Sequence, residues 1–184
     1  MGDYTVIADT GKTLIKLLRN ELTPYPITQP ELIGLASPAD KGDLSLSLFL
    51  YNIRESVEYR QAGMVQRGSG QPMAVELFYL MTAHSNADLS TRALDEHRIL
   101  GRAMQVLYDN GIIGGSTLQG TLSEHNESVR IVREHLPFDM MTSLFPHIPY
   151  KLSVSYLVGP VYLDSARSNP MKRVRQQDTQ MEEN

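Results

Sequence analysis

Histidine is the side chain in this sequence with the widest chemical use, because it can act as a general base or as a metal ligand near neutral pH. No two of the five histidines are three or four residues apart, so no single helix presents a pair of metal ligands on one face. His97 falls on the apolar stripe of an expected helix, where a satisfied, partly buried histidine is the usual explanation. Nothing in the spacing supports a zinc site assembled from distant histidines. The five are His84, His97, His125, His135 and His147.

A phosphate-binding loop is the next chemistry that the sequence could support. Gly11-Lys12-Thr13 ends like such a loop, but the motif needs a glycine five positions before Gly11, where this chain has Val6. The motif also follows a strand, whereas this tripeptide lies within an expected helix. The glycine-rich stretch 111–120 follows a helix instead of a strand, so a dinucleotide-binding fingerprint fails on its context. We therefore expect no nucleotide site.

The residues needed for nucleophilic or acid–base catalysis are not grouped in this sequence. The Gly-x-Ser-x-Gly turn of serine hydrolases is absent, and the lack of cysteine excludes disulfides, thiolate zinc sites and cysteine nucleophiles. The nearest paired carboxylates are Asp95 with Glu96, which straddle a helix surface, and Asp40 with Asp43, which lie in a turn. We expect a protein that is not an enzyme and has no cofactor and no metal.

Composition sets broader limits. The chain has 184 residues and a formal net charge of −4, with 41% apolar and 21% charged residues, which is typical of one globular domain. No run approaches the ~20 apolar residues of a membrane span, and the first residues lack the positive segment of a secretory signal. The acidic balance argues against a dedicated nucleic-acid binder. We expect a cytoplasmic protein with no membrane span and no nucleic-acid partner.

The elements that must position these side chains begin with an amphipathic helix over residues 3–22. It carries Ile7, Gly11, Leu14 and Leu18 on one face and places Asp9 on another, and Thr23-Pro24-Tyr25-Pro26 ends it. A short strand is expected over 31–35. Four leucines alternate through the next strand, over 44–53, and predict one buried face. Residues 55–72 predict a long hairpin connection, and 73–83 a central strand that is apolar on both faces.

The second half of the sequence predicts a long helix that begins at Ser85-Asn86-Ala87-Asp88 and ends at Asn110-Gly111. A weak strand over 128–135, a short helix over 137–145 and a last strand over 150–163 follow, with Pro160 indicating an edge or a bulge. The pattern predicts an α+β fold with a mixed, mainly antiparallel sheet flanked by helices. The apolar stripe expected on the long helix consists of Leu89, Ala93, His97, Leu100, Met104 and Leu107.

Four segments carry a more specific pattern. They are 37–55 (SPADKGDLSLSLFLYNIRE), 76–84 (ELFYLMTAH), 96–110 (EHRILGRAMQVLYDN) and 149–156 (PYKLSVSY). Together they resemble the cap, or tail-terminator, family of contractile injection systems, which are phage-tail-like particles. The resemblance covers residues 3–165. One departure is that the family tends to have a Trp-containing helix before Tyr150, whereas this chain has Leu144-Phe145-Pro146-His147 and no tryptophan.

The resemblance implies a fold similar to phage tail terminators and a structural, non-catalytic function. It implies a homo-oligomeric ring, hexameric by the family pattern, on the distal end of the inner tube and contractile sheath. There the ring ends polymerisation and joins tube to sheath, so the implied partners are sheath and inner-tube subunits. Such a component is assembled in the cytoplasm and is released or becomes membrane-associated as part of the particle.

Two regions are the candidate interface. Tyr51 and Arg54 lie at the end of the leucine strand, on a face that is only partly accounted for, although core packing is an equal interpretation of Tyr51. We expect residues 1–165 to form the cap domain and residues 166–184 to form a flexible tail, basic first and then acidic. The tail is either a contact to an adjacent cap or sheath subunit or an untethered solvated segment. Its basic residues are Arg167, Lys172, Arg173 and Arg175.

The competing interpretation is a small cytosolic enzyme or ligand-binding domain with an unrecognised site. That interpretation predicts a deep polar pocket in which His, Asp or Arg side chains converge.

Overall fold

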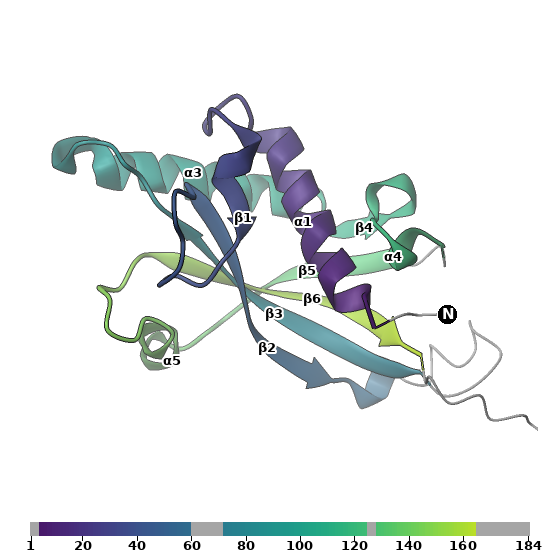
Figure 1. Ribbon diagram of the computed structural model, residues 1–184. Helices are drawn as coiled ribbons and strands as arrows, with labels where there is room; N and C mark the ends of the chain where they lie inside the picture. Colours follow the sequence, from purple (N-terminus) through teal and green to yellow (C-terminus); the bar gives the residue numbers. More distant parts are fainter. Residues whose placement is uncertain (1–3, 60–71, 125–127, 165–184) are drawn as a thin grey trace, which may run out of the picture.

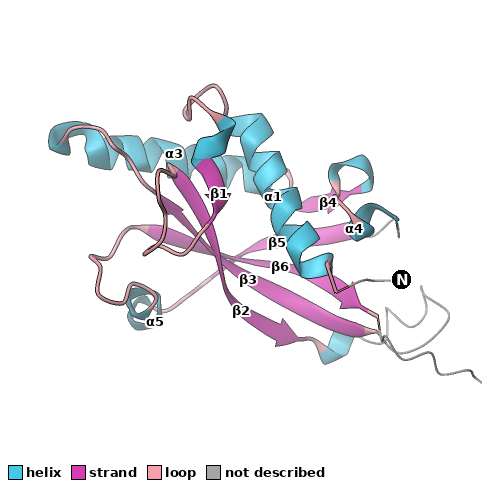
Figure 2. Cartoon of the chain, in the orientation of Figure 1, coloured by secondary structure: helices cyan, strands magenta, loops and turns pink. Residues whose placement is uncertain are grey.

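The protein forms a single sheet with its two longest helices on one face (Figures 1 and 2). The computed structural model describes residues 4–59, 72–124 and 128–164. The helices are α1 (Val6–Leu22), α3 (Leu89–Asp109), α4 (Thr121–Glu124) and α5 (Phe138–Ser143), with short 3₁₀ turns at Pro30–Leu32 and Gly115–Thr117. The strands are β1 (Ile33–Leu35), β2 (Leu46–Glu55), β3 (Met73–Ala83), β4 (Ile112–Gly114), β5 (Ser128–Glu134) and β6 (Ser153–Leu163).

The six strands are ordered β1-β2-β3-β6-β5-β4. Among the described strands, only β1 and β2 pair in parallel, and every other neighbouring pair is antiparallel. This confirms the expected mixed, mainly antiparallel α+β fold. The three longest strands lie in the middle, and each edge is a strand of three residues. Short edge strands offer few free backbone groups to another chain, which limits uncontrolled pairing.

The core lies between the sheet and the helices α1 and α3 (Figure 1). Alternation in the strands sends one set of side chains toward the helices, as Leu48 on β2 and Leu77 on β3 show. Leu14 and Leu18 of α1 and Leu107 of α3 complete this layer, and each is at most 2% exposed. The predicted leucine strand therefore exists, although it begins at Leu46, and Leu44 precedes it.

Helix α1 follows the prediction except at Asp9. The sequence placed Asp9 on a face away from the apolar stripe, but its side chain is buried, with the residue 4% exposed. The reason is a tertiary contact: Asp9 Oδ2 accepts hydrogen bonds from the backbone N–H of Thr121 at 3.2 Å and from its hydroxyl at 3.2 Å. A buried carboxylate is stable when donors of this kind satisfy it.

The sheet covers only the second half of helix α3. Its last turns bury Ile99, Leu100 and Ala103, with Val106 and Leu107, against the sheet. Its first turns project beyond the sheet (Figure 1), where Leu89 is 85% exposed. His97 is exposed as well, so the expectation of a partly buried histidine there is wrong. The periodicity identified the correct helix, but the sheet is too narrow to cover the whole of its apolar stripe.

Pro160 lies in a bulge inside the sheet. The register between β3 and β6 shifts between Val75 and Leu77, and Gly159 and Pro160 lie opposite this shift. The prediction of a bulge is confirmed, but β6 is not an edge strand, because β3 and β5 flank it. The bulge accommodates a residue that has no N–H to donate.

Candidate interface

Tyr51 lies on the sheet face opposite α1 and α3. The pairing of β2 with β3 shifts register between Leu50 and Asn52, so Tyr51 occupies a bulge. Its hydroxyl is hydrogen-bonded to Ser155 Oγ of β6 at 2.8 Å, and its ring lies 6.1 Å from the ring of Phe78 on β3. Tyr51 thus ties three strands together and is half-buried. Its predicted place in an interface stays a prediction, and its internal contacts are those of a packing residue.

Arg54 is held at the edge of the same face by an ion pair. Its Nε and Nη2 donate to Glu76 Oε2 at 3.0 and 2.8 Å, and its guanidinium carbon lies 5.0 Å from the centroid of the Phe78 ring. The arginine side chain is 60% exposed, whereas that of Glu76 is 11% exposed. The guanidinium is therefore oriented by β3 while much of its surface remains accessible. Oriented arginines beside aromatic rings are frequent at protein interfaces.

Sequence reasoning missed a buried polar pair at the other end of β2 and β3. Ser47 and His84 are 1% and 2% exposed, and Ser47 Oγ lies 2.9 Å from His84 Nε2. Nδ1 of His84 is buried without a hydrogen-bond partner. Burial lowers the pKa of His84 from 6.5 to about 4, and the positive charges of Lys151 and Lys41 act in the same direction. The imidazole is therefore neutral at pH 7.

This pair does not have the geometry of a catalytic dyad. A catalytic serine needs access to substrate and a histidine oriented by a third group, but both residues are buried and Nδ1 has no partner. The signal that could have found the pair is the β2–β3 register, in which Leu46 lies opposite Ala83. That register is not readable from residue patterns in one strand.

A second polar contact lies beside it. Glu96 Oε1 accepts hydrogen bonds from Lys151 Nζ at 2.8 Å and from the backbone N–H of Ser85 at 3.2 Å. Burial raises the pKa of the Glu96 carboxyl, but these two donors outweigh it and the pKa is lowered overall. Asp95, which the sequence pairs with Glu96, instead accepts a hydrogen bond from the hydroxyl of Ser85. The two neighbouring carboxylates therefore anchor the start of α3 and do not form an acid–base pair.

Two open grooves occur among the described residues. One, of about 650 Å³, lies between α3 and the strands β5 and β6. The other, of about 420 Å³, lies between the start of α1 and the paired strands β1 and β2. Both are lined mainly by apolar side chains, so neither is the polar pocket with converging His, Asp or Arg that an enzyme would require. No group of three His, Cys, Asp or Glu side chains in residues 4–59, 72–124 and 128–164 could hold a metal ion.

The basic tail residues lie outside the described part of the chain, as do residues 60–71 of the connection predicted over 55–72. Their contacts, and the division of the chain into residues 1–165 and 166–184, stay predictions. Among the helices that the structure describes, none combines the length and the apolar character needed to cross a bilayer. The tail residues are Arg167, Lys172, Arg173 and Arg175.

Comparison with known proteins gives a family and a fold. The sequence model of the Pvc16 N-terminal domain family matches residues 9–177. The fold resembles a PVC sheath/tube terminator of an extracellular contractile injection system in its extended state, with a TM-score of 0.57 and 17% identity over 99% of this chain. It also resembles the tube-terminating cap of the anti-feeding prophage, with a TM-score of 0.57 and 18% identity over 95% of this chain. No curated protein sequence matches.

This chain spans 66% and 61% of the lengths of those two solved chains. The resemblance to cap and terminator proteins that the sequence predicted is confirmed by the family match and by the shared fold. The descriptions of the two solved proteins are a sheath/tube terminator and a tube-terminating cap.

Proposed function

The chain belongs to the Pvc16 N-terminal domain family, and on this premise we propose that it is a structural cap of a contractile injection particle. In this role it binds the distal end of the inner tube and its sheath and ends their polymerisation. The observation that carries the proposal is the likeness of nearly the whole chain to a sheath/tube terminator and to a tube-terminating cap. This chain covers only part of the length of those proteins, so the binding of both tube and sheath by this chain is itself part of the proposal.

The sheet edges support a terminating role on physical grounds. A cap must bind the last ring of a growing tube and offer no surface on which the next ring can form. Strands β1 and β4, which bound the sheet, have three residues each, so neither edge of the described sheet is a long template for another strand. Meanwhile the oriented guanidinium of Arg54 and the two apolar grooves offer specific contact surfaces.

Ring formation, joining of tube to sheath and assembly in the cytoplasm are finer parts of the same proposal. A cap that covers a tube of ring-stacked subunits matches it best as a ring of the same symmetry, and six copies is the number that the family resemblance implies. The partners are then further copies of this chain and the tube and sheath subunits. Residues 166–184 are proposed as a segment that reaches one of these neighbours.

The experiment is removal of the chain from cells that make the particle, followed by electron microscopy of purified particles. We expect uncapped tubes and sheaths of irregular length, and recovery of uniform length when the intact chain is supplied again. A matched control is resupply of the Leu77→Asp variant, whose core is disrupted and which is expected not to restore length. Uniform, capped particles in the absence of the chain would refute the proposal.

A further inference from the structure

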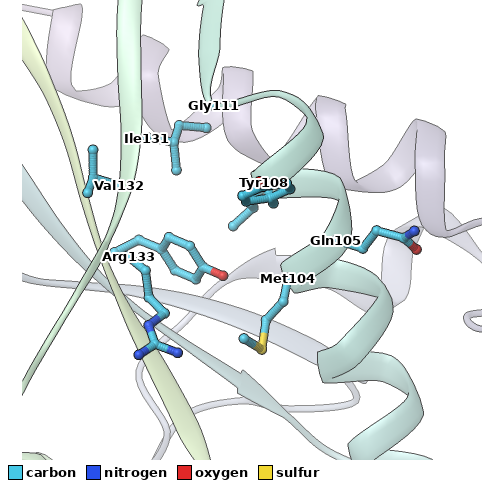
Figure 3. Close-up of a pocket in the computed structure, with 9 residues that line it drawn as sticks. Met104, Gln105, Tyr108, Gly111, Ile131, Val132 and Arg133 are labelled. Atoms are coloured by element: carbon cyan, nitrogen blue, oxygen red, sulfur yellow. The ribbon is translucent and has the colours of Figure 1, made fainter.

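The open groove beside α3 is an apolar surface with one unpaired charge. Met104 and Tyr108 of α3 face Ile131 and Arg133 of β5 across a space of about 650 Å³, and Figure 3 shows the helix residues and the strand residues on its two sides. Tyr108 is 86% exposed. No ion pair involves Arg133 within the described ranges 4–59, 72–124 and 128–164, so its charge is available to a partner.

The opposite end of the same helix carries a matching unpartnered surface. The first turns of α3 project beyond the sheet (Figure 1), with Leu89 85% exposed and Ala93 exposed one turn later. Asp88 precedes the helix, is exposed and makes no ion pair in the part of the chain that the structure describes. We call residues 88–93 the α3 tip.

We propose that the α3 tip of one copy docks into the groove beside α3 of the next copy. Leu89 then enters the apolar groove, and the carboxylate of Asp88 meets the guanidinium of Arg133. Apolar area is buried on both sides, and two opposite charges that make no ion pair with any described residue are paired with each other. The occupant is a second copy of this chain because tip and groove are complementary in both polarity and charge and lie on one molecule.

The relation between such copies is head to tail. Tip and groove are different surfaces at opposite ends of one helix, so in a ring each copy offers its tip to one neighbour and its groove to another. Two copies that filled each other's groove would form a closed pair and would give a single cross-linked dimer in place of a ladder, an outcome that would overturn the head-to-tail arrangement. A contact of this type repeats from copy to copy and closes into a ring when the rotation allows. The inference therefore rests on the ring that belongs to the proposed function and names the surfaces that would form it.

Cross-linking tests this contact, because the chain has no cysteine and any thiol is therefore an introduced one. In an Ala93→Cys/Gln105→Cys double variant, both positions are exposed, and they lie ~18 Å apart along one helix, too far for a short bis-maleimide to join within a copy. We expect a ladder of covalent oligomers from the double variant, in concentrated solution and on assembled particles. A matched control, Ala93→Cys/Lys12→Cys, places the second thiol at an exposed site of α1 away from the groove and is expected to give none.

Charge reversal gives an independent readout. Asp88→Arg and Arg133→Asp are each expected to weaken self-association about tenfold, and the variant carrying both is expected to recover it. Closed rings that give no ladder with the Ala93→Cys/Gln105→Cys variant would overturn this contact and leave the cap function untouched. The absence of a ladder both in solution and on particles would also overturn the contact between tip and groove. Loss of the proposed cap function would instead appear as particles of irregular length.

The same experiment separates the other possible occupant of the groove. If residues 165–184 of the chain fill the groove, the α3 tip is excluded from it, and a ladder appears only after those residues are deleted. A ladder that the intact chain gives and that persists after the deletion supports the docking of the α3 tip, and one that appears only after the deletion overturns it for the intact chain.

Discussion

The carboxylate of Asp9 accepts a hydrogen bond from the backbone N–H of Thr121, which lies 112 residues further along the sequence. Asp9 lies in the first turn of α1, and Thr121 is the first residue of α4, so the contact fastens the segment between β4 and β5 onto α1. Burial raises the pKa of the Asp9 carboxyl, but donation from Lys12, Thr121 and Thr5 lowers it overall. The carboxylate is therefore ionised and held by hydrogen bonds at pH 7.

Asp9→Ala is expected to lower the free energy of unfolding by about 2 kcal/mol, because it removes several hydrogen bonds to a buried, charged acceptor. Urea denaturation followed by circular dichroism measures the change. Lys12→Ala is the control: Lys12 also pairs with Asp9, at 3.1 Å, but its side chain is 66% exposed, so its loss should cost less than about 1 kcal/mol. Equal losses in the two variants would contradict this interpretation.

Gly120→Ala tests the same contact from the other side. Gly120 has φ +58°, and a Cβ added there would overlap Asp9 Oδ2. Gly115 has φ +60° with nothing within 4 Å of an added Cβ, so Gly115→Ala measures backbone strain alone. We expect Gly120→Ala to lower the thermal midpoint clearly more than Gly115→Ala does. If the two midpoints are the same, the Asp9 carboxylate moves freely and does not fix the loop.

His84 makes stability depend on pH. Its pKa is lowered from 6.5 to about 4 by burial first, so the unfolded chain binds this proton more readily than the folded chain. The contribution of neutral His84 is therefore complete above pH 6.5 and is lost progressively as the pH falls toward 4. Asp9 and Glu96 have lowered carboxyl pKa values, so their contributions are also lost as the pH falls, but mainly below this window.

The measurement is the free energy of unfolding at several pH values between 7 and ~4 in the intact chain and in His84→Gln. We expect the variant to be less stable at pH 7 but to show a shallower decline with acidification. Ser47→Ala serves as a control, because it removes the partner of Nε2 and keeps the titrating ring. Identical slopes in the intact chain and in His84→Gln would refute the assignment.

Arg54→Gln tests the candidate interface. Arg54 is 60% exposed, so its replacement should lower the free energy of unfolding by about 1 kcal/mol or less, mainly through the lost pairing with Glu76. If the guanidinium contacts a tube or sheath subunit, the fraction of uniformly capped particles in electron micrographs should fall severalfold. Arg130→Gln, at an exposed position on β5, is the control and should leave capping unchanged. Normal capping by Arg54→Gln removes Arg54 from the interface.

Deletion of residues 165–184 tests the proposed tail contact. We expect the truncated chain to keep its thermal midpoint, because the core that the structure describes is formed by residues before Asp164. We also expect particles made with it to be poorly capped or bent, since the basic residues of the segment would no longer meet a neighbour. Straight, normally capped particles would mean that the segment makes no necessary contact.

Local patterns predicted the elements but not their partners. The alternation through β2 and the spacing in α1 are properties of single segments, so period and composition were sufficient to identify them. The burial of Asp9 depends on Thr121, and the pairing of Ser47 with His84 depends on strand register, and both arise only when distant segments meet. Of the stripe predicted on α3, Leu100 and Leu107 are buried, whereas Leu89 is exposed because the sheet does not extend beneath it. The buried residues Ile99, Ala103 and Val106 lie beside that stripe and were not predicted to be on it.

In the candidate interface, too, local pattern predicted the position of a residue but not its contacts. Arg54 was identified from its position at the end of an alternating strand, but its orientation by Glu76 and Phe78 comes from the neighbouring strand. The family resemblance supports a proposed function for which residue chemistry gives no signal, since a structural cap would need no catalytic constellation. Surfaces that bind by shape leave no short motif in a sequence.

The long ladder between β3 and β6 also has a mechanical consequence. Nine residue pairs align these two strands, from Met73 opposite Leu163 to Thr82 opposite Ser153. Hydrogen bonds in an antiparallel pair run perpendicular to the strands, so tension applied along the strands shears all of them together and does not unzip them one after another. If the chain joins sheath and tube as proposed, force transmitted between them would load these strands, and the paired hydrogen bonds of β3 and β6 would share it.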